Sequence, residues 1–203
     1  MTIETERLLF RPWREEDAEV LYEYAKDPRV GPAAGWKPHE SVEESREIIR
    51  TVLTQGENYA LVLKELGHPV GCVGLMTPSL HERERDEADG IKGITVGYWL
   101  GVPFWGRGLM PEAVEALLEY CFQTLGCGRV WCGYFDGNEK SKRVQEKCGF
   151  RYHHTNRSIA LADGVIRTEQ VSCLSRERWE QRAAAQTSAA HGESEDCSLP
   201  AGM

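Results

Sequence analysis

The stretch Gly97-Tyr-Trp-Leu-Gly-Val-Pro-Phe-Trp-Gly-Arg-Gly-Leu-Met-Pro-Glu-Ala113 decides the fold, because it joins a strand to a helix through a glycine turn. Residues 91–100 are rich in β-branched and aromatic residues and have no helical period, which predicts a strand. Downstream, Pro111 suits a first helical turn and apolar residues recur at helical spacing, so a helix is expected from about Met110. Gly97 within the strand indicates a bulge or a close backbone approach.

The turn between these elements has the composition of an anion site. Gly106 and Gly108 can adopt the positive φ angles that aim successive N–H groups at one point. The helix N-terminus adds a partial positive charge, and the side chain of Arg107 adds a full one. Because proline has no N–H, the expected donors lie before it, in Gly106, Arg107, Gly108, Leu109 and Met110. This turn is predicted to hold a pyrophosphate.

Several kinds of glycine turn compete for this stretch. A dinucleotide-binding Rossmann turn needs a third glycine where Pro111 stands, and an ATPase phosphate loop needs a Gly-Lys-Ser/Thr sequence that is absent. An isolated Gly-x-Gly also occurs in plain tight turns with no ligand. A further alternative is the pyrophosphate loop of GNAT N-acetyltransferases, Gln/Arg-x-x-Gly-x-Gly/Ala. Here Trp105 holds the first place, Gly108 fits, and Met110 replaces the small residue.

Two blocks of sequence resemble the RimJ/RimL-like branch of the GNAT family. The first comprises Tyr98 to Leu100, Phe104 to Gly108, and Glu112-Ala113, and is similar to the branch's Gly-Tyr-Trp-Leu, Tyr/Phe-Trp-Gly-x-Gly and Glu-Ala. The second, residues 138–150, resembles its Asn-x-x-Ser...Glu-Lys-x-Gly-Phe. The resemblance extends from Glu4 to Trp179 and implies an α+β GNAT fold.

The order of predicted elements agrees with that fold. Strands are expected at residues 7–13, 58–64, 69–76, 91–100, 130–135, 151–158 and 168–174, and helices at 15–26, 41–55, 110–125 and 139–148. This gives a mixed, mostly antiparallel sheet of about seven strands with about four helices and one βαβ step in the middle. Residues 30–39 are expected to form a loop, and the charged run 81–89 a solvated one.

Composition limits the class of protein. The chain has 203 residues, 41% of them hydrophobic, and no apolar run long enough to cross a bilayer, which predicts one domain at 1–182 without membrane contact. Residues 183–203 have little to pack and are expected to be a disordered tail. A net charge of −8 argues against nucleic-acid binding. The N-terminus lacks a secretory pattern, and the seven cysteines lack disulfide or zinc-ligand spacing, so a cytoplasmic protein with no metal is expected.

The resemblance also implies roles for site residues. The backbone of Tyr98, Trp99 and Leu100 would pair with the pantetheine arm of acetyl-CoA, and a bulge at Gly97 would free an N–H for the thioester oxygen. Asn138 would steady the cofactor, although an asparagine there also suits a helix N-cap. Ser141 would donate a proton to the leaving thiolate, with Tyr98 as a second catalytic candidate.

The general base and the acceptor wall are less defined. Thr95 stands where the branch often has a glutamate, and threonine is no base at neutral pH. Substitutes are a water chain ordered by Thr95 and Tyr98, a carboxylate upstream, or His39. The upstream carboxylates are Asp86, Glu87 and Asp89. Trp36 is the candidate substrate-binding wall or a packing anchor, and a further aromatic, Tyr134, is either a second proton donor or a packed side chain.

The resemblance therefore predicts an acetyl-CoA-dependent N-acetyltransferase. Its expected acceptor is a protein N-terminal amine, and the alternatives are a small amine, such as a polyamine, amino sugar or antibiotic, and a non-catalytic acetyl-CoA sensor. Either a monomer or a homodimer is compatible with the sequence.

Overall fold

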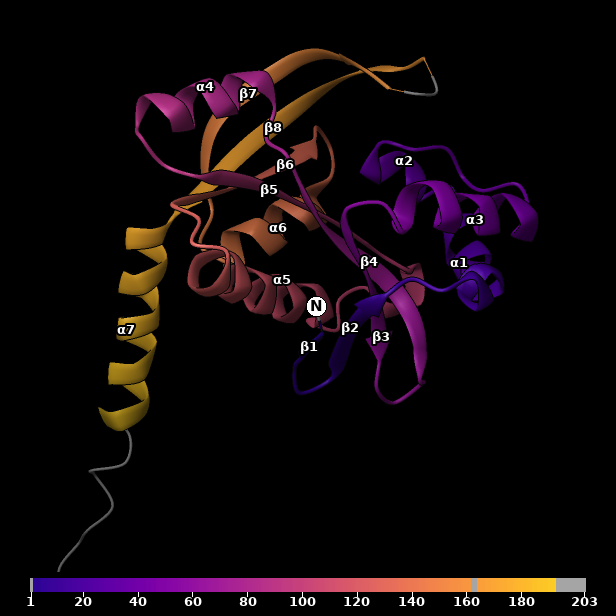
Figure 1. Cartoon of the computed structure of the whole chain (residues 1–203), viewed down its shortest axis with the longest axis horizontal. Helices are drawn as coiled ribbons and strands as arrows, with labels where there is room; N and C mark the ends of the chain where they lie inside the picture. Colours follow the sequence, from indigo (N-terminus) through magenta and orange to yellow (C-terminus); the bar gives the residue numbers. More distant parts are fainter. Residues whose placement is uncertain (1, 162–163, 193–203) are drawn as a thin grey trace, which may run out of the picture.

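The computed structural model describes residues 2–161 and 164–192, which contain a single eight-stranded sheet (Figure 1). The strand order is β1-β2-β3-β4-β5-β6-β8-β7. The strands are β1 (Ile3–Glu4), β2 (Leu8–Pro12), β3 (Glu57–Leu63), β4 (His68–Met76), β5 (Gly93–Leu100), β6 (Arg129–Phe135), β7 (Arg151–Ala160) and β8 (Ile166–Ser175). Only β5 and β6 pair in parallel, and every other neighbouring pair is antiparallel. The predicted α+β architecture with a mixed, mostly antiparallel sheet is confirmed, with the two-residue β1 as the additional strand.

Seven α-helices lie in the described residues, more than the four expected. They are α1 (Ala18–Ala25), α2 (Gly31–Ala34), α3 (Val42–Ile48), α4 (Leu80–Ala88), α5 (Leu109–Glu119), α6 (Glu139–Lys147) and α7 (Arg176–Gly192). π-helical turns extend α3 to Leu53 and α5 to Thr124. The N-terminus of α5 lies one residue from its predicted place, with Gly108 as the N-cap.

Two of the predicted loops are wrong. The segment 30–39 contains the single turn α2, which ends at Gly35 with a φ of 92°. The charged run 81–89 forms α4, because Ser79 and Glu82 make a capping box at its start. A solvated loop was expected from the charge alone, but Asp86 is buried. Its carboxylate accepts hydrogen bonds from Arg129 Nη1 and Trp131 Nε1, both at 2.8 Å.

Side-chain alternation divides the central sheet into two faces. One face packs against α5 and contains Leu61, Val73, Val96 and Val130 of the larger core. The other face packs against α1 and α3, in a smaller core that includes Trp13, Leu21, Ala60 and Cys72. Since successive residues of a strand point to opposite sides, each residue of β5 and β6 is assigned to one of these faces.

The predicted bulge at Gly97 is absent. The register between β4 and β5 is continuous from Gly71↔Leu100 to Met76↔Thr95, with Gly97 opposite Gly74. The alternative interpretation, a close backbone approach, is not found among the described residues either, because the atom nearest to a Cβ on Gly97 would be Met76 Cε, a side-chain atom at 2.7 Å.

The C-terminal helix runs past the end predicted for the domain. α7 continues to Gly192, ten residues into the segment expected to be a tail, and Figure 1 shows it running away from the sheet. Its first turns are anchored, since Trp179 stacks on Phe122 at 5.2 Å and Arg182 donates a hydrogen bond to the Cys148 carbonyl. The domain boundary at residue 182 stays a prediction, and residues 193–203 lie outside the described part. No described helix is long and apolar enough to span a bilayer.

Candidate active site

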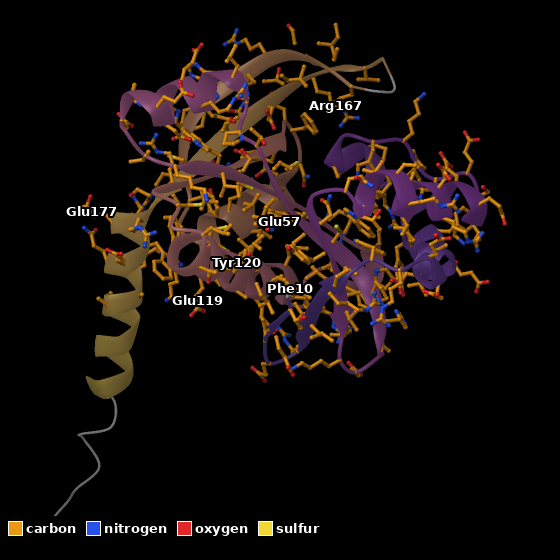
Figure 2. The ribbon with its side chains drawn as sticks, in the orientation of Figure 1. Phe10, Glu57, Glu119, Tyr120, Arg167 and Glu177 are labelled. Carbon is orange, nitrogen blue, oxygen red and sulfur yellow. The ribbon has the colours of Figure 1, made fainter. Side chains whose placement is uncertain are left out.

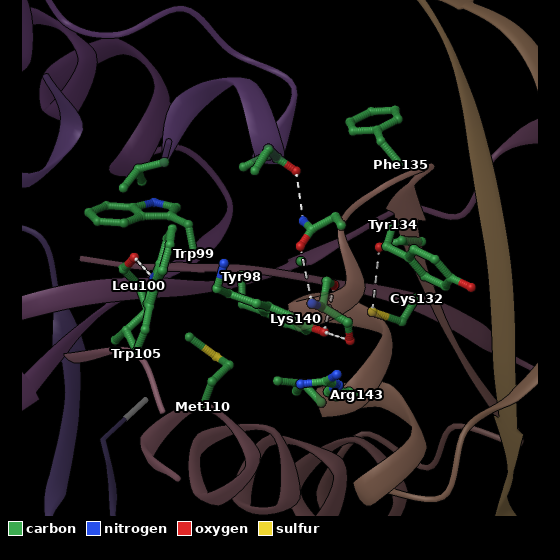
Figure 3. Close-up of a pocket in the computed structure, with 18 of the residues that line it drawn as sticks. Tyr98, Trp99, Leu100, Trp105, Met110, Cys132, Tyr134, Phe135, Lys140 and Arg143 are labelled. Carbon is green, nitrogen blue, oxygen red and sulfur yellow. Dashed lines mark hydrogen bonds between the residues drawn. The ribbon is translucent and has the colours of Figure 1, made fainter. Parts of the chain in front are cut away.

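A cleft of about 830 Å³ opens where β5 and β6 part (Figure 3). The two strands pair only from Gly93↔Arg129 to Thr95↔Trp131, and then each continues without the other. The edge of β5 from Val96 to Leu100 therefore has no hydrogen bonds to β6. Such an edge offers backbone N–H and C=O groups to an extended ligand.

The register assigns the residues of the cleft to its two faces. Tyr98 and Cys132 lie on the α5 side of the sheet, each two residues after a core residue of that side. Thr95, Gly133 and Phe135 belong to the opposite side, near α2, where a Cβ atom on Gly35 would lie 3.2 Å from the Phe135 ring. The cleft thus extends through the gap between the strands, from α5 and α6 on one face of the sheet to α2 and β8 on the other.

The two predicted catalytic hydroxyls meet at this gap. Tyr98 Oη lies 3.0 Å from Ser141 Oγ, and its hydroxyl donates a hydrogen bond to the Ser141 carbonyl at 3.2 Å. Burial raises the pKa of Tyr98 well above its ordinary value, since the phenolate would lose its hydration. The phenol consequently keeps its proton at neutral pH, as a proton donor must.

Gln145 is a buried neighbour of these two hydroxyls. Its Nε2 donates to the Gly133 carbonyl at 3.1 Å and reaches Ser141 Oγ at 3.5 Å. The side chain is buried, and its Oε1 has no partner among the described residues. Gln145 was not singled out in the sequence, although its place one helical turn after Ser141 is a signal that could have found it.

The glycine turn has the predicted conformation. Gly106 and Gly108 have φ angles of 75° and 76°, and both line the cleft together with Leu109 and Met110. The turn is held from outside by Arg7, which donates to the Arg107 carbonyl at 2.9 Å and pairs with Glu112 at 2.6 Å. The backbone N–H groups at the start of α5 are thereby fixed in position at the cleft.

Arg107 itself does not line the cleft. Its guanidinium is exposed and lies 3.3 Å from Glu65, on the β3–β4 turn. Arg107 lies between two glycines with positive φ angles, and its side chain projects outward from the turn. Its positive charge therefore does not point into the predicted anion site.

Positive charge reaches the cleft from α6 instead. Lys140, Arg143 and Lys147 all line it, and Lys140 Nζ lies 4.3 Å from the ring centroid of Trp105 (Figure 3). Their spacing of three and four residues places them on one helical face, a signal present in the sequence but not used there. With the N-terminus of α5 opposite, this end of the cleft favours an anion.

Other predicted residues have structural contacts. Asn138 caps α6 by accepting from Ser141 N at 3.2 Å, and its Nδ2 donates to the Ala33 carbonyl at 3.1 Å. The Leu100 carbonyl accepts from Trp105 Nε1 at 2.7 Å, and Trp99 packs edge-on against Trp36 at 5.9 Å. Both Trp99 and Leu100 line the cleft, as does Asn138, while Trp36 does not.

None of the predicted substitutes for the base brings a carboxylate or imidazole into the cleft. His39 is buried, with Nδ1 2.8 Å from Ser45 Oγ, and burial lowers its pKa. Neither Asp86, Glu87 nor Asp89 lines the cleft. Thr95 does line it, with a buried hydroxyl that has no partner among the described residues.

Glu169 and Arg167 are the charged residues of β8 that line the cleft, and both were missed in the sequence. Arg167 extends from β8 toward α2, where it donates to the Pro32 carbonyl at 2.9 Å (Figure 2). They lie beside β6 because β8 pairs with it in antiparallel register, with Phe135 opposite Glu169. No local sequence pattern predicts this pairing. In the part of the chain that the structure describes, no group of three His, Cys, Asp or Glu residues is arranged to hold a metal ion.

Comparison with known proteins agrees with this geometry. Residues 7–151 match the family model described as an acetyltransferase (GNAT) domain. The chain belongs to the GNAT family of acetyltransferases. Family and relatives together identify an acetyl-CoA-dependent N-acetyltransferase, as the two motifs indicate.

Its relatives include the branch named from the sequence. The protein titled "Uncharacterized N-acetyltransferase p20" from Bacillus licheniformis is 29% identical over 182 residues, 87% of this chain and 97% of the relative. The [ribosomal protein uS5]-alanine N-acetyltransferase of Escherichia coli is 29% identical over 84 residues, 41% of this chain and 43% of that protein. Mycobacterium smegmatis RimJ, solved with CoA-disulfide, shares the fold with a TM-score of 0.70 at 22% identity, over 94% and 95% of the chains.

Proposed function

We propose that this GNAT acetyltransferase binds acetyl-CoA along the free edge of β5, with the pyrophosphate at the glycine turn. The unpaired edge from Val96 to Leu100 supports the placement of the pantetheine arm. The backbone N–H groups from Gly106 to Met110, and the α6 cations Lys140, Arg143 and Lys147, would bind the phosphates. Trp99 and Asn138 would border the arm.

The observation that carries this proposal is the Tyr98–Ser141 pair at the point where the strands part. In this placement the thioester lies beside two hydroxyls that hold their protons at neutral pH. Ser141, supported by Tyr98, protonates the departing thiolate, and holding the two reactants together supplies much of the rate.

We propose a protein N-terminal amine as the acceptor. The name of the E. coli relative supports this choice. An α-amine has a pKa of about 8, so a substantial fraction is already neutral at pH 7 to 8. Trp36 packs on Trp99 and does not line the cleft, so we propose it as a packing anchor behind the acceptor side. A small amine is the second candidate acceptor.

A test measures free thiol released from acetyl-CoA against N-terminal peptides, polyamines and aminoglycosides. Turnover with peptides is the expected result, and turnover with small amines alone would replace the proposed acceptor. If acetyl-CoA raises the melting temperature while every acceptor of the panel fails, the chain binds the donor, and the outcome favours either an acceptor outside the panel or the sensor alternative.

A further inference from the structure

A carboxylate from β8 lies against the acceptor side of the cleft. Glu169 pairs in register with Phe135, so its side chain points to the face that carries Gly133 and Thr95, opposite α5 and α6. A Cβ atom on Gly133 would lie only 2.1 Å from Glu169 Oε1. The carboxylate therefore occupies the place that a side chain at position 133 would fill, at the wall of the gap.

The contacts of Glu169 leave one of its oxygens available. Oε2 accepts a hydrogen bond from Asn156 Nδ2 at 3.1 Å, which fixes the side chain. Oε1 has no hydrogen-bond donor among the described residues and is not sealed from solvent. The residue itself is half-buried, so its charge is screened less than that of an exposed carboxylate.

The cleft contains one other carboxylate among its described lining residues. Asp136 is exposed at the end of β6, and its Oδ1 accepts from Gln170 Nε2 at 2.8 Å. It lies beyond the strand, at the rim. Glu169 is thus the carboxylate within the paired strands, on the same face as Thr95, the position from which a glutamate is missing.

We propose that Glu169 binds the ammonium group of the acceptor and removes its proton, an inference that rests on the proposed function. One proton passes from the ammonium to Glu169 and then to solvent. The freed nitrogen lone pair forms the new C–N bond with the thioester carbon. The C–S bond breaks, its electron pair leaves on sulfur, and sulfur takes a proton from Ser141. The nitrogen loses its second proton to solvent, from which Ser141 is reprotonated.

The test compares Glu169→Gln with Asp136→Asn, which neutralises the rim carboxylate. Glutamine keeps an oxygen for Asn156 and nearly the same shape. At pH 7 about one tenth of an α-amine with a pKa of about 8 is neutral, so kcat/KM for the acceptor is expected to fall about tenfold in Glu169→Gln, while the KM for acetyl-CoA stays within twofold. Asp136→Asn is expected to remain within threefold of the unmodified protein.

A pH profile separates proton removal from mere support of the fold. Near pH 9.5 a peptide α-amine is already neutral, so the Glu169→Gln deficit is expected to shrink to about twofold or less. Gly133→Ala, which displaces the carboxylate, is expected to reproduce part of the neutral-pH deficit. A deficit that is the same at pH 7 and pH 9.5, or no deficit at all, would overturn the role of Glu169.

Calorimetry covers the case in which no acceptor is acetylated. Binding of the peptides and polyamines is then measured on the CoA-loaded protein and on Glu169→Gln. Weaker binding to the variant supports the ammonium site although the proposed transfer has failed. Equal binding to both, or binding to neither, overturns the site.

Discussion

The chemistry of single residues depends here on which hydroxyls are kept from water. Tyr98 and Ser141 belong to different elements, β5 and α6, yet their oxygens lie 3.0 Å apart. Burial holds the pKa of Tyr98 well above 10, so its neutral form persists below that raised pKa and is lost only above it.

Replacing Ser141 with alanine should separate proton transfer from binding. Without the hydroxyl, turnover is expected to fall about tenfold to 100-fold, since Tyr98 can still donate in part. The dissociation constant for acetyl-CoA, measured by calorimetry, should stay within twofold. Glu146→Ala, exposed on the same helix, is the matched control and should leave both quantities unchanged. Equal losses of turnover and affinity would give Ser141 a structural role.

The site residues that the sequence missed share one property. Glu169 is brought to the cleft by the pairing of β8 with β6, and Gly133 makes room for it. Neither fact follows from the letters near residue 169, because strand register between distant segments has no local signature. Thr95 could be recognised as a departure from the branch, but no local pattern indicates which carboxylate lies on the same face of the sheet.

At the scale of elements, the strand-turn-helix unit is the part that sequence reasoning predicted best. Its glycines, its proline and its apolar period are local signals, and α5 begins within one residue of the expected place. The orientation of the Arg107 side chain could not be predicted from nearby residues, because its partner Glu65 lies on the β3–β4 turn. The anion site therefore depends on backbone N–H groups and on α6 more than on the charge within the turn.

A carboxylate at the turn should abolish donor binding. Gly108→Glu places a negative charge where the pyrophosphate is proposed to bind, so acetyl-CoA affinity is expected to fall at least 100-fold by calorimetry. Gly67→Glu is the control, because Gly67 has a similar φ of 71° with nothing near its Cβ position and lies outside the cleft. Both variants carry the same left-handed strain of about 1 kcal/mol. Unchanged affinity in Gly108→Glu would remove the proposed anion site.

Helix α4 shows how charge counting misleads. Its many acidic residues predict exposure to solvent. One of them, Asp86, is nevertheless buried and joins α4 to β6 by accepting hydrogen bonds from Arg129 and Trp131. Only the buried partners, more than 40 residues away, distinguish Asp86 from its exposed neighbours. The prediction of a solvated loop failed for that reason.

Removing this carboxylate should cost stability without touching the cleft. Asp86→Ala removes the acceptor of the Trp131 indole N–H and one of the two carboxylates that pair with the mostly buried Arg129 guanidinium, which keeps Asp89 at 2.7 Å, so the free energy of unfolding is expected to fall by about 2 to 3 kcal/mol. Urea unfolding measures this loss, and Glu87→Ala, exposed on the same helix, should change it by less than about 0.5 kcal/mol. A loss of under about 1 kcal/mol for Asp86→Ala would show that the buried contacts do not stabilise α4 on the sheet.

For the whole molecule, the weak point of the sheet is also its functional gap. Strands β1 to β5 and strands β6, β8 and β7 form two halves that meet through only three register pairs between β5 and β6. The fold class follows from the order of predicted elements, whereas this parting of two parallel strands does not. It was inferred from family resemblance, and the bulge assumed to cause it is absent.

A donor that lies in this gap should join the two halves and stabilise them together. Ligand at 100 times its dissociation constant adds about 2.7 kcal/mol to the folded state. In a chain of this size, that corresponds to a rise in melting temperature of about 5 to 11 °C. Hydrogen exchange should slow at β5 residues 96–100 and in α6 at the same time, because the ligand contacts both halves. A thermal shift with protection confined to one half would place the ligand elsewhere, and Gly108→Glu should abolish both the shift and the protection.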